Sequence, residues 1–279
     1  MFLGSQSSYS FVDTQKPFNI TYGTGSVDGN VVKDNIIVAG LQLPNHTFGV
    51  AKQETVDFSS DQTRFDGIMG LAQSGLSQQE TLTPVESLAK AGLIQEAITS
   101  FKISRLADQK NDGQVTFGGL DGSKFDQQTL VTMNNVNTRG FWEAPVDAVS
   151  VNNADLGLNG RTAILDTGTT LLLVPQPDAE AIHKGIPGAV ANSDGTFTIP
   201  CTTNTSVALT FSRKSFAIDS RDIVFAPVDP NNLTGDCISG IMAGQIGGQT
   251  QWLVGDVFLK NAYFSTNVGK NTIQLANLI

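Results

Sequence analysis

The chain has 279 residues, of which 40% are apolar and 15% are charged, and its formal net charge is −9. This apolar content is that of a folding chain rather than a disordered one, and the acidic balance makes nucleic acid and anionic lipid unsuitable partners. The 28 glycines and the recurring short runs of threonine, valine and phenylalanine favour many short strands joined by tight turns.

The first predicted element is a β-hairpin over residues 18–38. Its β-branched and aromatic residues alternate with polar ones, and the alternation breaks at Gly23, Gly25 and Gly29, as in a glycine-rich tip. Further along, Phe65–Leu71 is a short apolar run bounded by glycines, so we expect a buried strand or turn there.

A helix is predicted to begin at Pro84. Thr83 can cap this helix, proline suits its first position, and Glu86 completes a capping box. Gly92 is expected to end it.

A second helix is predicted from Pro177 to Lys184, with Gly185 as its end. His183 falls in the last turn of this helix. We expect its side chain to be solvated there, because a histidine at a helix end needs no partner other than water.

Short strands are expected again from Gln114 onward. We place a division near residue 130, giving a first unit over 1–130 and a second over 131–279. No low-complexity linker separates the two, so they are expected to pack directly.

The chain contains two cysteines, Cys201 and Cys237, and two histidines, His46 and His183. These four residues cannot assemble a standard zinc site, so no metal is expected. The cysteines lie 36 positions apart and can form one disulfide or remain two buried free thiols. No window of 18 consecutive apolar residues occurs, so no membrane span is expected.

Four N-x-S/T sequons occur, at Asn19, Asn45, Asn204 and Asn232. Three of them, Asn45, Asn204 and Asn232, are the glycosylation candidates. Sequons together with a possible disulfide favour a secretory compartment, outside the cell or vacuolar. The polar stretch that follows Met1 does not have the pattern of a signal peptide.

The sharpest chemical feature is Asp166, which follows an apolar run at Ala163–Leu165 and opens a turn with Thr167 and Gly168. A second apolar run begins directly after this turn. Apolar flanks place the carboxylate at the end of a buried strand, where hydroxyl and backbone N–H groups can hold its charge. A plain Asp-Thr-Gly turn is the alternative, but it would need no such burial.

These residues resemble the pepsin family of aspartic proteases, and the resemblance covers nearly the whole chain in the same order. Asp166 to Thr170 is similar to the second active-site motif of that family, and Tyr22 to Ser26 is similar to the tip of its flap hairpin. The remaining matches are the first-lobe segment Phe65–Leu71, its second-lobe counterpart Trp252–Phe258, and the second-lobe disulfide position at Cys201 and Cys237.

The resemblance implies a mainly β, bilobal fold with an incomplete N-terminal lobe, because the family has two Asp-Thr-Gly motifs and this chain has one. Gly255 lies 89 positions after Asp166, and the same spacing counted back from Gly70 reaches a point about 19 positions before Met1. We therefore expect a truncated chain whose first catalytic aspartate lies upstream of the printed residues.

The family's chemistry implies an acid endopeptidase in which two aspartates share a proton and activate a water. Asp166 would be the catalytic member present, with no cofactor. A peptide would be contacted by flap residues Tyr22, Gly23 and Thr24 and by Gly168, Thr169 and Thr170. The resemblance implies a monomer with a peptide or protein substrate, and residues 1–279 alone are expected to be inactive.

Two alternatives remain. A non-catalytic peptide-binding protein could keep the cleft and the flap without the pair of aspartates. A homodimer could pair two copies of Asp166 across chains, although a first lobe that carries its own flap argues against this arrangement.

Overall fold

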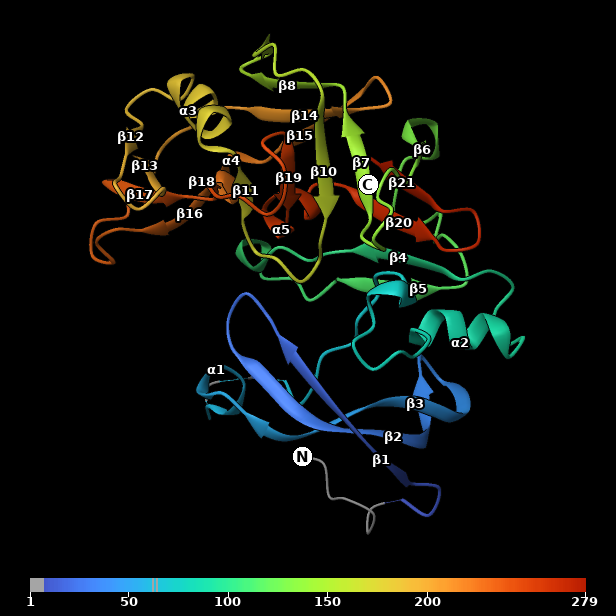
Figure 1. Cartoon of the computed structure of the whole chain (residues 1–279). Coiled ribbons are helices and arrows are strands. Elements are labelled where there is room, and N and C mark those ends of the chain that lie inside the picture. The colour runs from blue at the N-terminus through green and yellow to red at the C-terminus, as the bar shows by residue number, and fades with distance from the viewer. Residues whose placement is uncertain (1–7, 62, 64) are drawn as a thin grey trace.

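The computed structural model describes residues 8–61, 63 and 65–279. Short strands dominate this part of the chain and form five sheets, so the predicted mainly β fold is confirmed. Figure 1 shows a lower part built from the first three strands and a larger upper part that contains the remaining strands. Within the described residues, none of the helices is both long enough and apolar enough to span a membrane.

The lower part is a three-stranded antiparallel sheet in the order β1-β2-β3. Its strands are β1 (Val12–Thr21), β2 (Ser26–Val38) and β3 (Leu41–Glu54), followed by the short helix α1 (Val56–Ser59). Thr21 pairs with Ser26 across the tip. The hairpin predicted over residues 18–38 is therefore confirmed, with Gly23 and Gly25 in its tip, whereas Gly29 lies within β2 opposite Phe18.

Helix α2 (Pro84–Lys90) begins as predicted. The backbone N–H of Glu86 donates to the Thr83 hydroxyl, and the Glu86 carboxylate accepts from the Thr83 backbone N–H, so both halves of the capping box form. Gly92 follows the helix with a φ of +70°, a left-handed conformation that glycine adopts without strain.

A five-stranded sheet combines three strands from residues 98–134 with the last two strands of the chain. Its order is β5 (Gln114–Phe117), β4 (Ile98–Lys102), β20 (Tyr263–Asn267), β21 (Thr272–Ala276) and β6 (Val131–Asn134). This sheet combines strands from both sides of residue 130, so a division at that point stays a prediction.

The upper part also holds the main hydrophobic core and three further sheets. The central sheet has the order β18 (Ile241–Ala243), β11 (Leu172–Val174), β19 (Gln251–Val254), β10 (Arg161–Leu165) and β7 (Glu143–Val146). A second sheet has the order β15 (Lys214–Ile218), β14 (Val207–Phe211), β8 (Ala148–Val151) and β9 (Ala154–Asp155). The third has the order β12 (Val190–Ala191), β13 (Phe197–Pro200), β17 (Asp236–Ser239) and β16 (Val224–Pro227). Helices α3 (Gln176–Lys184), α4 (Ser220–Ile223) and α5 (Asp256–Leu259) accompany these sheets.

The two cysteines form one disulfide, Cys201–Cys237, which resolves the choice between a disulfide and free thiols. It links the turn after β13 to strand β17, so it cross-links the β12-β13-β17-β16 sheet, which we call the outer sheet of the upper part.

Helix α3 forms where it was predicted, but the expectation for His183 is wrong. The side chain is 3% exposed, and its ring stacks on Phe197 with 3.8 Å between centroids. Its ring nitrogens lie 2.7 Å from the carbonyl oxygen of Ala179 and 2.9 Å from Oγ of Ser239. Because the outer sheet packs over this helix end, His183 is a core residue, and burial lowers its pKa.

The expectation of a buried strand or turn over Phe65–Leu71 is also wrong. The described residues of this segment form no strand, and Phe65, Ile68 and Met69 are each about half exposed. A strand needs a hydrogen-bonded neighbour, and no described strand pairs with this segment.

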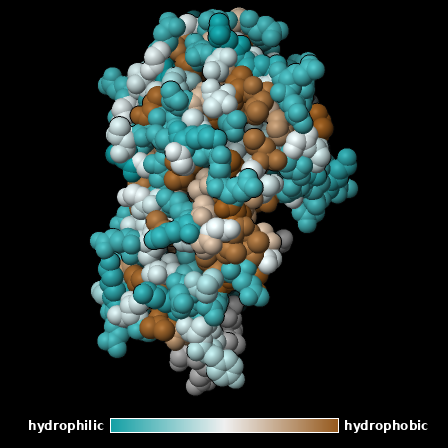
Figure 2. Space-filling model, turned by 90° about the vertical axis from the view of Figure 1, so that its right-hand side faces the viewer, coloured by the Kyte–Doolittle hydropathy of each residue, from teal (hydrophilic) through white to brown (hydrophobic). Residues whose placement is uncertain are grey.

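Figure 2 shows that hydrophobic side chains gather on one face of the molecule, around the level where the upper and lower parts meet.

Candidate active site

Strand β10 delivers Asp166 to the end of the central sheet. This strand lies between β19, which runs parallel to it, and β7, which runs antiparallel. Ala163 and Leu165 are at most 3% exposed. The backbone N–H of Asp166 donates to the carbonyl of Val254 at 3.0 Å, so the sheet fixes the position of the residue while its side chain stays half-buried. The apolar run before Asp166 forms the buried strand that the sequence predicted.

The turn that follows Asp166 holds its carboxylate. The backbone N–H of Gly168 donates to Oδ1 at 2.9 Å, and the hydroxyl of Thr169 donates to Oδ2 at 2.6 Å. A Cβ at position 168 would lie 3.2 Å from Oδ1, so glycine suits this close approach. Both carboxylate oxygens therefore have a fixed donor.

The turn between β19 and α5 is hydrogen-bonded to the turn that contains Asp166. The backbone N–H of Asp256 donates to the carbonyl of Thr169 at 2.8 Å, and that of Val257 donates to the carbonyl of Thr170 at 3.0 Å. A Cβ on Gly255 would lie 2.1 Å from the Thr169 carbonyl oxygen, so only glycine permits this contact.

Asp256 also belongs to the candidate site, although its sequence pattern did not predict a role for it. Its pKa is raised to about 6, mainly by burial and also by the charge of Asp166, while the charge of Lys260 opposes the rise. Its buried Oδ1 has no hydrogen-bond partner among the described residues. The sequence did contain a signal, since Asp256 directly follows Gly255 in the segment that resembles the family. Its burial and its nearness to Asp166 depend on the fold.

The predicted flap residues form a separate group at the tip of the β1–β2 hairpin. The backbone N–H of Tyr22 donates to the carbonyl of Gly25 at 3.0 Å, and Gly25 has a φ of +73°. Gly23 and Thr24 are exposed, whereas Tyr22 is half-buried, and burial raises the pKa of Tyr22.

Aromatic rings line the base of this tip. The ring of Tyr22 meets that of Phe58 edge-on at 5.3 Å between centroids, and Phe58 meets Phe65 at 6.5 Å. In Figure 1 the tip points toward the upper part, and β10 runs down toward the lower part. No hydrogen bond or ring contact between described residues joins Tyr22, Gly23 or Thr24 to the Asp166 turn, so the structure supports two groups of site residues rather than one assembled site.

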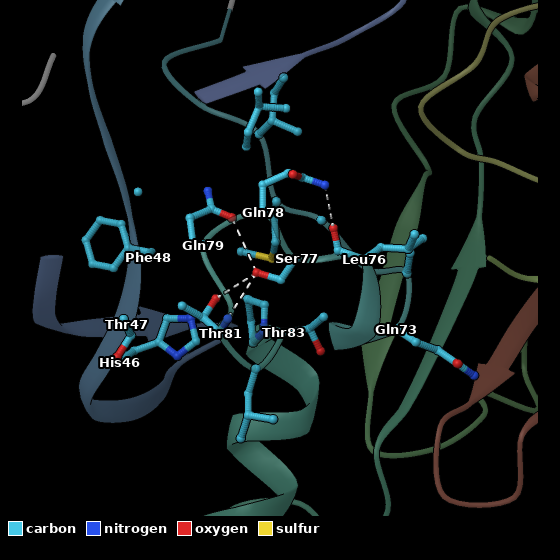
Figure 3. A pocket seen from close by; sticks show the side chains of 18 of the residues that line it. His46, Thr47, Phe48, Gln73, Leu76, Ser77, Gln78, Gln79, Thr81 and Thr83 are labelled. Atoms are coloured by element: carbon cyan, nitrogen blue, oxygen red, sulfur yellow. Dashed lines mark hydrogen bonds between the residues drawn. The ribbon is translucent and has the colours of Figure 1, made fainter. Parts of the chain in front are cut away.

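A cavity of about 410 Å³ lies between the three-stranded sheet and the segment from Ile68 to Pro84, at the start of α2. Figure 3 shows His46, on β3, on one side of it and the segment from Gln73 to Thr83 on the other. Its lining includes Tyr22, Ile68 and Met69, so the cavity runs from the flap to the Phe65–Leu71 segment. His46 is 6% exposed, and burial lowers its pKa.

All three glycosylation candidates, Asn45, Asn204 and Asn232, are exposed. Asn232 lies in the loop between β16 and β17, and its Oδ1 accepts hydrogen bonds from the backbone N–H and the hydroxyl of Thr234. Their modification stays a prediction.

The chain matches the family model described as eukaryotic aspartyl protease over residues 1–278. It is 36% identical over 274 residues to a protein of Arthroderma otae named probable aspartic-type endopeptidase CTSD, covering 98% of this chain and 70% of that protein. It is 37% identical to the aspartic-type endopeptidase ctsD of Aspergillus fumigatus, covering 92% and 53%, and 33% identical to rhizopuspepsin of Rhizopus chinensis, covering 94% and 64%. The chain thus spans between about half and 70% of the length of these relatives.

Proposed function

Since the chain belongs to the eukaryotic aspartyl protease family, we propose that Asp166 is a catalytic aspartate of an endopeptidase that works in acid. The observation that carries this proposal is the pair of hydrogen bonds that fixes the Asp166 carboxylate. Asp166 stands at the end of a buried strand with one fixed donor on each oxygen, and it remains partly open to solvent.

The proposed reaction uses two carboxylates that share one proton. The ionised one removes a proton from a water, which attacks the carbonyl carbon of the scissile peptide bond. The protonated one donates to the carbonyl oxygen and later to the leaving amine. Such a pair titrates as a unit, so its activity is expected to be highest in acid.

The second carboxylate is proposed to come from a segment outside the printed residues. In the upper part, Gln251–Val254 lies as β19 between β10 and β11, which flank the Asp166 turn. Among the described residues, no strand pairs with the corresponding segment Phe65–Leu71, and a cavity of about 410 Å³ adjoins it. The sequence contains a single Asp-Thr-Gly. Residues 1–279 alone are therefore proposed to lack peptidase activity.

The proposed substrate is an extended peptide with apolar side chains near the cut. The exposed tip residues Gly23 and Thr24 can cover a bound peptide and exclude water, and the aromatic group of Tyr22, Phe58 and Phe65 offers an apolar surface below them. Gly168, Thr169 and Thr170 would face the peptide backbone.

We further propose a monomer in an oxidising compartment, secreted or vacuolar. The disulfide Cys201–Cys237 and the exposed sequon at Asn232 support this location.

The test compares residues 1–279 with the protein purified from its source, using an internally quenched apolar peptide at acid pH. We expect cleavage by the native protein and none by residues 1–279. Acid cleavage by residues 1–279 that is lost in Asp166→Asn would refute the proposed need for an outside aspartate.

The second candidate function is non-catalytic peptide binding, which the single Asp-Thr-Gly favours. In that case the native protein would bind a non-hydrolysable analogue of the same peptide and would leave the peptide itself intact at every pH.

A further inference from the structure

Lys260 stands one helical turn after Asp256, at the end of α5. Its backbone N–H donates to the carbonyl of Asp256 at 3.0 Å, so the two residues are in the i, i+4 relation. In this relation, an acid that precedes a base on a helix ordinarily pairs with it. Here the pair does not form, and Oδ1 of Asp256 remains buried without a hydrogen-bond partner among the described residues.

The ammonium of Lys260 binds Asp222 instead, with 3.0 Å between Nζ and Oδ1. Asp222 belongs to α4, and its side chain is 2% exposed. Burial alone would raise the pKa of Asp222, but hydrogen bonds from Arg105, Lys260 and Asn261 outweigh it and hold the pKa below its ordinary value. Asp222 is therefore an ionised, buried carboxylate.

Asp222 has more partners than its single charge requires. Arg105 donates from Nε to both carboxylate oxygens at 3.0 Å and from Nη2 to Oδ2 at 2.6 Å. The side chain of Asn261 donates to Oδ2 at 2.9 Å. One guanidinium already compensates the charge of Asp222, so Lys260 is a second cation bound to that carboxylate. The carboxyl of Asp256 forms no ion pair among the described residues, although Lys260 lies close enough to influence its pKa.

We propose that Asp222 and Asp256 compete for Lys260, and that Asp222, by retaining it, keeps the carboxyl beside Asp166 uncharged in weak acid. Lys260 and Asp222 are positioning residues in this account, because they act on the site only through Asp256. The pKa of about 6 for Asp256 agrees with the proposal.

The charges around Asp256 are few in the part of the chain that the structure describes. Asp166 acts on it from the turn after β10, and Lys260 acts on it from its own helix. Asp222 on α4 binds Lys260, and Arg105 lies behind Asp222. The effect of this arrangement on catalysis rests on the proposed function. An uncharged Asp256 adds no negative charge near Asp166, so it does not oppose the ionisation of one carboxylate of the proposed pair.

The test is an NMR titration of the Asp256 side-chain carboxyl carbon in residues 1–279, with the resonance assigned by its absence in Asp256→Asn. Lys260→Met removes the cation, so the pKa of Asp256 should rise above about 6. Asp222→Asn releases Lys260 toward Asp256, so the same pKa should fall toward its ordinary value of 3.8. A merely structural role would not produce opposite shifts.

The double variant Lys260→Met with Asp222→Asn separates transfer of the cation from a direct effect of the Asp222 charge. We expect the double variant to titrate like Lys260→Met. An equal fall on Asp222→Asn in both backgrounds, or an unchanged titration in Lys260→Met, would overturn the proposal. If Asp222→Asn fails to fold, Lys260→Met decides alone, because Lys260 is partly exposed.

Lys270→Met is the matched control, since Lys270 is an exposed lysine paired with Glu96 and should leave the titration unchanged. The titration needs no substrate. Its failure therefore counts against this inference alone, and a native protein that cleaves no peptide counts against the proposed function alone.

Discussion

The hydroxyl of Thr169 donates a 2.6 Å hydrogen bond to Oδ2 of Asp166. The carbonyl of the same threonine accepts from the backbone N–H of Asp256 at 2.8 Å. Thr169 therefore connects the carboxylate at the end of β10 with the start of α5, and the geometry of the site depends on two turns that are far apart in the sequence.

The hydroxyl of Thr169 can be tested separately from its backbone. Thr169→Val keeps the shape and the backbone contacts but removes the donor, and we expect it to lower the free energy of unfolding by about 1 kcal/mol at neutral pH. Thr169→Ser retains the hydroxyl and should cost less. Urea unfolding of the three proteins measures this difference, and equal losses in both variants would show that the hydrogen bond contributes nothing.

The burial of Asp256 predicts a pH dependence of stability. Because its folded-state pKa is raised from 3.8 to about 6, the fold favours the protonated form, and the stabilisation present below pH 3.8 is lost as the pH rises through about 6. Asp256→Asn cannot ionise and should not show this loss. Its advantage over the wild type should be near zero at pH 4 and reach on the order of 2 kcal/mol at pH 7.

Chemical unfolding of the wild type and of Asp256→Asn at a series of pH values measures that difference. A constant difference from pH 4 to pH 7 would contradict the raised pKa.

The disulfide is expected to stabilise the upper part of the molecule. It joins residues 36 positions apart, and replacing both Cys201 and Cys237 by serine should lower the free energy of unfolding by about 3–4 kcal/mol in the chain-entropy description. Guanidinium unfolding of the double variant measures the loss. Addition of a reductant should produce a similar loss in the wild type and none in the variant.

Met69 and Val254 occupy corresponding places in the two halves but differ in burial. Met69 is 47% exposed, whereas Val254 is fully buried in β19. In residues 1–279, Met69→Ala should change the free energy of unfolding by less than about 0.5 kcal/mol, and Val254→Ala should lower it by about 2 kcal/mol.

The same pair of variants can be made in the native protein. There Met69→Ala should become costly if another segment covers Phe65–Leu71. A cost at position 69 as small as in residues 1–279 would argue against the proposed outside strand.

Features set by neighbouring residues could be predicted from the sequence. The β1–β2 hairpin follows from alternation and glycines, and the start of α2 follows from Thr83 and Glu86. Asp166 was found because the apolar runs on both sides of it are themselves a sequence pattern.

Features set by distant packing could not be predicted. His183 is buried because Phe197 and Ser239 pack over its helix. The Phe65–Leu71 segment is apolar enough for a strand, but a strand also needs a neighbour, which the sequence of the segment does not contain. The pKa of Asp256 is raised mainly by its burial, and no local sequence pattern encodes that burial.

The most direct test of the account is acid cleavage of an apolar peptide by the native protein and by its Asp166→Asn variant, prepared identically. The account predicts cleavage by the wild type and a loss of at least about 1,000-fold in the variant, because the remaining carboxyl group cannot act as both acid and base. Equal cleavage by the two proteins would contradict it, since Asp166 would then take no part in the reaction.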